Sequence, residues 1–375
     1  MLSRIAKKIV SYQTKYPKKF ILVFILLNLL LIPGIFNLLG NVEPSLEKVL
    51  PQEVQEIETM NYMRSQFGAD MIYLVVYTTD DLADVRNPDY LEYTDILSQK
   101  IITRENVMDV QSLSDISKDL NNDQIPSTLT QSRAILSNTP RTQTYTNNDY
   151  SFSVMKVQTN VGSSADQIDK VITQIEEDIQ NTQQFNPGTN TEITGSPAID
   201  RATFNVIISD FATITLISMA GVALIVFLTF KSLAKGMLPM AVVMNAIIWT
   251  MGIAGYLQLT ITVVTMVAAA MIMGLGIDFG IHQVHNYFEE RKTKKPKVAL
   301  DEVMQELLRA MLGASLTTSA GFLALLFGVL PAMKTLGIIL AIGIMNTLIG
   351  AVFLLPVLIY LYDTNHIKKS NEAIQ

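Results

Sequence analysis

One acidic residue of this chain stands inside a long apolar stretch. Asp278 ends the run Leu259–Asp278, in which nearly every other side chain is apolar, small or a hydroxyl. An ionised carboxylate is costly inside a bilayer, so an acid at that depth usually faces a protein interior or a water-filled path. The position of Asp278 therefore predicts a group on an ion or substrate route.

The residues around Asp278 follow helical spacing. Gly274, Asp278, His282 and His285 lie at i, i+4, i+8 and i+11 and share one helix face. We expect His282 to act as a relay partner of the acid and His285 to lie nearer the interface with water. The glycines at 274 and 276 remove side chains beside the carboxylate, which lets another helix approach closely.

A second set of small and hydroxyl residues begins the next apolar segment. Gly313, Thr317 and Gly321 form a stripe at i, i+4 and i+8, and Thr318 flanks it. These hydroxyls could hydrogen-bond the acid or hold water beside it. We therefore predict one relay with two parts, which are the polar residues Asp278, His282, Thr317 and Thr318 and the packing glycines Gly274, Gly276, Gly313 and Gly321.

Other kinds of chemistry find little support. The chain has no cysteine, and its three histidines, His282, His285 and His366, lie outside the polar region 41–205. That region holds no Gly-rich phosphate loop, no Ser/His pair and no His/Asp metal cluster. We expect no enzyme activity, no metal and no cofactor. A lone aspartate suits H⁺ as the coupling ion and leaves Na⁺ as an alternative.

Charge divides the chain in two. Residues 41–205 carry 11 Lys and Arg against 25 Asp and Glu, a balance of −14, whereas the remainder has a balance of +8. The overall hydrophobic fraction is 49%. A basic apolar part with an acidic insert indicates a membrane protein that carries one inserted polar domain, and it argues against a nucleic-acid partner.

Six apolar segments have about the 17–25 residues needed to cross a membrane. We predict a polytopic α-helical membrane protein with one span in residues 1–40 and five in 206–362. A cytoplasmic amphipathic helix is expected at about 288–310, lying on the bilayer. The predicted spans are Phe20–Leu39, Val206–Phe230, Met237–Leu257, Leu259–Val284, Met311–Leu330 and Leu336–Leu361.

Basic residues set the expected orientation. They cluster before the first span, after the second, after the fourth, and in the tail 363–375, whereas the short loops between are almost uncharged. The positive-inside rule then places both termini in the cytoplasm and residues 41–205 outside the cytoplasmic membrane.

The outer region has the pattern of an α+β domain. Expected strands at Met71–Thr78, Val107–Leu113, Asp149–Thr159 and Thr191–Gly195 alternate with expected helices at Asn87–Ile102 and Ser163–Thr182, and Pro51–Phe67 is a further helix. The order is a split βαβ, ferredoxin-like pattern. We interpret it as a binding or gating domain.

With these motifs in place, the chain resembles half of a resistance-nodulation-division (RND) superfamily transporter. The motif Gly274–His282, followed by Tyr287–Arg291, is similar to the fourth-helix motif of the hydrophobe/amphiphile efflux and MMPL-like branches. Thr317–Phe327, with Pro331 and Gly337 after it, resembles their fifth and sixth helices. In residues 41–205 the resemblance is architectural only.

The resemblance implies a secondary active transporter with an outer porter domain and with Asp278 as its proton-relay residue. Two departures matter. Relatives often have tyrosine where this chain has Phe279, and drug-efflux members have a second acid where it has Ile277. A tyrosine hydrogen-bond partner and the drug-efflux charge triad are therefore not expected.

Most relatives have two six-span halves, and this chain resembles one. We expect a homodimer that brings two copies of Asp278 together, with a trimer or half of a longer chain as alternatives. The polar tail Asn365–Gln375 is expected to be a true end. The leading hypothesis is export of amphiphiles or lipids driven by the proton-motive force. The alternatives are an accessory of protein translocation and a lipid- or sterol-sensing module.

Overall fold

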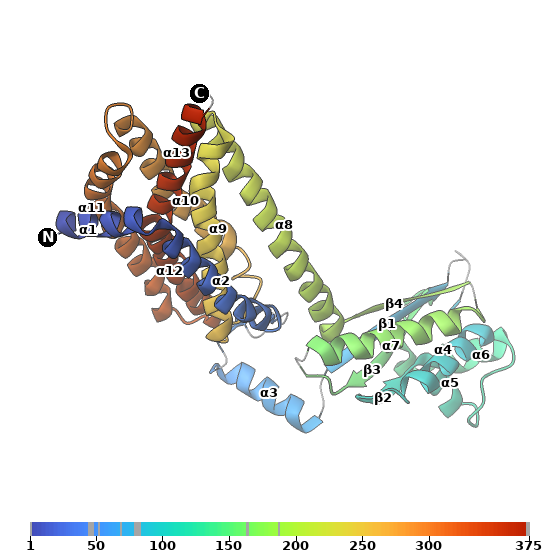
Figure 1. The fold of residues 1–375 in the computed structure, drawn as a ribbon. Coiled ribbons are helices and arrows are strands. Elements are labelled where there is room, and N and C mark those ends of the chain that lie inside the picture. Colours follow the sequence, from blue (N-terminus) through green and yellow to red (C-terminus); the bar gives the residue numbers. More distant parts are fainter. Residues whose placement is uncertain are drawn as a thin grey trace. The chain divides into compact units, whose positions relative to one another are not determined.

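The computed structural model describes residues 2–43, 49–51, 53–67, 70–78, 84–162, 165–186 and 188–372 (Figure 1). The chain divides into two compact units. Residues 52–205 form one unit, and residues 1–51 together with 206–375 form the other. The long helix α8 (Ser196–Phe230) begins in the first of these and continues into the second.

The unit 52–205 is built on a four-stranded antiparallel sheet with the order β2-β3-β1-β4. The strands joined through helices, β1 with β2 and β3 with β4, are each separated by one intervening strand. The elements are α3 (Gln55–Phe67), β1 (Asp70–Thr78), α4 (Pro88–Ile101), β2 (Val107–Gln111), α5 (Leu113–Asp119), α6 (Leu129–Leu136), a 3₁₀ turn (Pro140–Thr144), β3 (Phe152–Thr159), α7 (Ala165–Gln183) and β4 (Thr189–Gly195).

Alternation of apolar residues along the strands explains how this sheet packs. Ile72, Leu74 and Val76 of β1 are fully buried and point to one face, which α4 and α7 cover. Tyr90 of α4 is buried there, and its hydroxyl donates to the Val76 carbonyl at 2.7 Å. One face of the sheet therefore forms the hydrophobic core of this unit together with the helices that cover it.

The other unit is helical. Its elements are α1 (Leu2–Lys15), α2 (Pro17–Leu39), the main part of α8, α9 (Leu233–Tyr256), α10 (Ala268–Glu290), α11 (Pro296–Leu323), a 3₁₀ turn (Ala324–Phe327), α12 (Pro331–Ile349), a π-helical turn (Gly350–Leu354) and α13 (Leu355–Glu372). The predicted polar tail after residue 362 continues α13 to Glu372.

Five helices in the described part of the chain are long and apolar enough to cross a membrane. They are Pro17–Leu39, Ser196–Phe230, Leu233–Tyr256, Pro296–Phe327 and Pro331–Asn365. The predicted span Leu259–Val284 is not among them. Its first residues, 259–267, lie outside any helix, and α10 carries Asp278, His282 and Gln283, which lower its apolar character. The chain is a multi-pass membrane protein, and a sixth span stays a prediction.

The expected surface helix at about 288–310 differs in the structure. Pro296 starts α11, and no further proline follows before Pro331, so the segment is the first half of one long helix that ends at Leu323. Its apolar residues Ala299, Leu300 and Met304 are buried in a cluster with Ala6 and Val10 of α1. This face therefore packs on protein instead of lying on the bilayer.

Glycines bring α2 and α9 into backbone contact. A Cβ atom at Gly255 would lie 1.7 Å from the carbonyl oxygen of Gly34, and one at Gly252 would lie 2.6 Å from that of Leu31. Nearby, the rings of Phe24 and Trp249 stack with centroids 5.1 Å apart. This contact fixes α9, which in turn supports α10.

Candidate ion-relay site

Helix α10 has two opposite faces. Gly276 and Gly280 lie on the packed face, where a Cβ atom would meet Thr347 of α12 at 2.4 Å and Pro239 of α9 at 2.5 Å. Gln283 and Tyr287 continue that face and are fully buried. Because positions two apart on a helix point in nearly opposite directions, the face that carries Asp278 is turned away from α9 and α12.

That second face is open within the chain. Gly274, Asp278, His282 and His285 are all exposed, and nothing lies within 4 Å of a Cβ placed at Gly274. Asp278 has no hydrogen bond or ion pair with any residue that the structure describes. The carboxylate is therefore held on a helix packed against α9 and α12 but has no partner among the described residues.

Beside this face, α10 and α11, with Ile344 of α12, line an open-sided cavity of about 350 Å³. Asp278, His282 and Thr318 are its polar lining residues. Since a water molecule in liquid occupies about 30 Å³, the cavity has room for several waters near the carboxylate. The remaining lining residues are Leu275, Phe279, Leu307, Ala310, Met311, Ala314 and Ile344.

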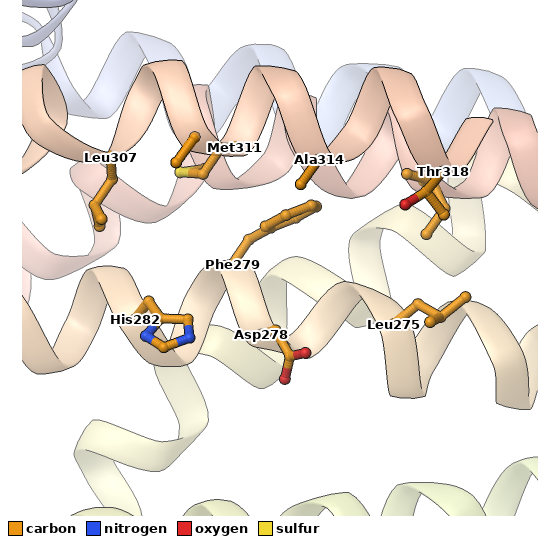
Figure 2. Close-up of a pocket in the computed structure, with 10 residues that line it drawn as sticks. Leu275, Asp278, Phe279, His282, Leu307, Met311, Ala314 and Thr318 are labelled. Carbon is orange, nitrogen blue, oxygen red and sulfur yellow. The ribbon is translucent and has the colours of Figure 1, made fainter. Parts of the chain in front are cut away.

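Figure 2 shows where the lining residues lie on the two helices, with the Asp278 carboxylate directed away from α11. Asp278, His282 and Leu275 project from α10, and the Phe279 ring lies between α10 and α11. The side chains across from them on α11 are those of Leu307, Met311, Ala314 and Thr318. A phenyl ring at 279 fills space without offering a hydrogen-bond donor, so polar contacts to the acid must come from elsewhere.

The structure brings together three of the four predicted relay residues. Thr317 is exposed, lies outside the cavity, and donates its hydroxyl to the carbonyl oxygens of Gly313 and Ala314 of its own helix, each at 3.0 Å. A helical hydroxyl used in this way is satisfied locally. Of the two threonines, Thr318 is the one that lines the same cavity as Asp278.

The four predicted packing glycines also separate. Gly276 packs tightly, but against α12 and away from Asp278. Gly274, Gly313 and Gly321 have nothing within 4 Å of a Cβ atom, so each leaves open space in the chain. Within one chain these three glycines do not pack around the acid. At these positions α10 and α11 present backbone surface without side chains, and no other described residue covers it.

A second polar cluster ties the end of α10 to α13. Asp363 of α13 accepts hydrogen bonds from the Tyr287 hydroxyl at 2.8 Å and from Arg291 Nε at 2.6 Å, and the latter is also an ion pair. We call these three residues the α10–α13 latch. Sequence reasoning noted Tyr287 and Arg291 as a motif but missed Asp363. Their i, i+4 spacing could have indicated a shared acidic partner.

The prediction from the sequence also did not include two buried polar side chains, those of Gln283 and Ser315. Gln283 donates to the sulfur of Met304 at 2.9 Å while its Oε1 atom has no partner in the described part of the chain, and the buried Ser315 hydroxyl has none there either. Unpaired buried polar atoms are costly and often mark unseen water. The only sequence signal was the presence of these residues within apolar runs.

Comparisons with known proteins agree with this architecture. Over 372 residues the chain is 29% identical to MJ1562 of Methanocaldococcus jannaschii, described by name only as a membrane protein, and the match covers 97% of this chain and 95% of that one. MmpL12 of Mycobacterium tuberculosis, named as a transport protein, is 23% identical over 157 residues, which are 40% of this chain and 14% of MmpL12. A family model described as MMPL family matches residues 47–372, which confirms the resemblance seen in the sequence, and the chain belongs to the MMPL family.

Proposed function

We propose that this protein is a secondary active transporter that uses the proton-motive force to export amphiphiles or lipids from the cytoplasmic membrane. The MMPL family includes transporters of lipids and other hydrophobic molecules. The observation that carries the proposal is Asp278 of α10, an acid without a partner among the residues that the structure describes, next to a cavity that His282 and Thr318 also line. Each proton that crosses the membrane supplies about 2.3 kcal/mol per 100 mV.

In this proposal the termini lie in the cytoplasm and residues 52–205 act outside as a porter domain of ferredoxin-like type, which the strand order β2-β3-β1-β4 supports. Six spans are proposed, with α10 as the one that carries the relay. A helix of 23 residues is about 34 Å long, which is sufficient for a bilayer core of about 30 Å.

We further propose that two copies meet through the open faces of α10 and α11. An exposed carboxylate facing lipid would be costly, so a second protein surface is needed over Asp278. Gly274, Gly313 and Gly321 leave room for a partner helix at close range. A two-fold axis would bring the two Asp278 side chains near each other, and neighbouring acids titrate as a coupled pair.

The proton step is tested with Asp278→Asn in proteoliposomes that carry a pH-sensitive dye. We expect loss of substrate-dependent proton flux, because an amide keeps the size of the side chain but cannot exchange a proton. Asp210→Asn on α8 is the matched control and should keep the flux. Full proton-coupled transport by Asp278→Asn would disprove the relay.

The dimer is tested separately with introduced cysteines, since the natural chain has none. Gly313→Cys and Gly321→Cys should each form a cross-linked dimer in membranes. Leu224→Cys, on the exposed side of α8, is the control that should not. Cross-linking at Leu224→Cys but not at either glycine position would contradict the proposed interface.

A further inference from the structure

Helix α1 packs on the protein through one narrow stripe. Ala6, Val10 and Gln13, at i, i+4 and i+7, are 0%, 0% and 1% exposed and face α11 and α13. In Figure 1, α1 lies beside α11, next to the marker for the N-terminus of the chain. The opposite side of α1 is covered by no other described element.

The uncovered side combines positive charge with apolar surface. Ile5 and Tyr12 are 41% and 67% exposed on it, between basic residues. Such a composition is typical of a helix that lies at the headgroup level of a membrane. The exposed basic residues of α1 and of the first turn of α2 are Arg4, Lys7, Lys8, Lys15, Lys18 and Lys19.

These cations differ from the basic residues that follow α10. There, Arg291 pairs with Asp363, Lys292 with Glu289, and Lys294 with two glutamates. By contrast, no acidic side chain in the described part of the chain forms an ion pair with a basic residue of α1.

Lys7 is attracted by Asp301 of α11 without forming an ion pair, and the Lys15 ammonium lies 5.2 Å from the centre of the Tyr16 ring. Both side chains stay exposed, so the charge of α1 is available to an external anion.

The place of α1 in the chain indicates which anion this is. Only Tyr16 separates α1 from α2, a helix that can cross a membrane. The basic side of α1 must therefore lie near the membrane surface, where phosphate headgroups are concentrated.

Gln13 connects this helix to an irregular point of the bundle. Its side-chain amide donates to the carbonyl oxygens of Val352 at 2.8 Å and Phe353 at 3.2 Å. Both belong to the π-helical turn between α12 and α13. A π turn shifts the backbone hydrogen-bond pattern and is frequent at functional sites, and Gln13 supplies a donor to carbonyl oxygens there.

We propose that the basic side of α1 binds the headgroups of anionic phospholipids, and that Gln13 transmits this binding to the π-helical turn. The inference rests on the membrane topology proposed above, which puts α1 at the cytoplasmic leaflet, and is independent of the relay. A Lys or Arg at an anionic surface contributes roughly fivefold in affinity. Lipid bound on α1 would hold the helix in place and stabilise the turn that Gln13 contacts.

The experiment uses the full chain in nanodiscs of phosphatidylcholine alone or with an equal amount of phosphatidylglycerol. Native mass spectrometry measures retained phosphatidylglycerol. We expect the combined variant Arg4→Gln, Lys7→Gln, Lys8→Gln and Lys15→Gln to lose at least roughly tenfold in its preference for this lipid. The pair Lys292→Gln and Lys294→Gln, whose charges are already paired, should keep the preference.

A second measurement tests transmission. Phosphatidylglycerol should slow amide hydrogen exchange in residues 350–354 of the natural chain but not of Gln13→Leu, which should still bind the lipid. Unchanged lipid preference in the four-site variant, or displacement of the lipid by inorganic phosphate, would overturn the headgroup site. Equal slowing in Gln13→Leu would overturn the transmission. Asp278→Asn should retain lipid binding, so failure of the relay is distinguishable from failure here.

Discussion

Alanine at Gly276 and alanine at Gly274 should affect stability in opposite directions, although the two positions are two residues apart on α10. At Gly276 the new Cβ atom would lie 2.4 Å from Thr347 Cγ2 and 3.1 Å from Thr347 Cβ. Thr347 cannot easily rotate away, because its hydroxyl donates to the carbonyl oxygens of Gly343 and Ile344 at 3.1 and 2.7 Å. The helices must therefore move apart.

The two variants share one favourable contribution. Replacing glycine by alanine inside a helix stabilises it by about 0.5–1 kcal/mol. At Gly274 nothing lies within 4 Å of the new atom, so this gain should be seen undiminished. At Gly276 overpacking costs about 1–3 kcal/mol. The difference in unfolding free energy between the variants isolates the overpacking and should be about 1–3 kcal/mol, with Gly276→Ala the less stable.

Denaturant unfolding in detergent that keeps the protein monomeric measures this difference. The chain has a single tryptophan, Trp249, which is buried in the helical unit and reports its unfolding by fluorescence. If Gly274→Ala destabilised the monomer as much as Gly276→Ala, the assignment of an open and a packed face to α10 would be wrong.

Three further changes test other parts of the structure. Asp363→Asn should weaken two hydrogen bonds of the α10–α13 latch, cost about 2–3 kcal/mol and speed amide exchange at the ends of both helices, with no effect on exchange in the sheet. Gly255→Leu should separate α2 from α9 and change Trp249 fluorescence, whereas Gly221→Leu, on an open part of α8, should not. Burial of the Asp84 carboxyl raises its pKa, but the hydrogen bonds from Arg86 and Arg133 outweigh burial, and the net pKa is lowered. The ionised carboxyl therefore stabilises the folded protein fully above its ordinary pKa of 3.8, and this stabilisation is lost as the pH falls through the lower pKa of the folded state. Amide exchange in β1 and β3 should accelerate over that acidic range, and Asp84→Asn should remove the dependence.

Much of the architecture follows from local patterns. The apolar runs predicted the long helices because each run exceeds the length of a soluble core helix, and the length and the β-branched and aromatic content of Met71–Thr78 predicted β1. The i, i+4, i+8 spacing also predicted that Gly274, Asp278 and His282 share a face, as they do along α10.

What a helix face contacts could not be predicted in the same way. Periodicity places Gly276 and Gly274 on different faces but does not tell which face meets α12. The same limit explains Thr317 and Thr318, since a rotation of about 100° separates a residue that lines the cavity from one that does not.

Contacts between residues far apart in the sequence could not be predicted for a related reason. The apolar stripe of residues 298–310 suits a bilayer surface as well as it suits α1, and composition does not distinguish the two. Asp363 lies 72 residues from Arg291, so nothing local connects them. The contact of Gly34 with Gly255 depends on the crossing point of two helices, which neither apolar run specifies.

The π-helical turn has a consequence for how this part of the chain can change in length. A π turn holds one more residue than an α-helical path of equal rise, so every side chain beyond it is rotated by about 100° relative to an uninterrupted helix. Because the turn absorbs one residue, deletion of one residue within 350–354 would restore a regular helix and leave Asp363 beside Tyr287. A relative of the same length that lacks the turn would instead need its acid one position earlier, where this chain has Tyr362.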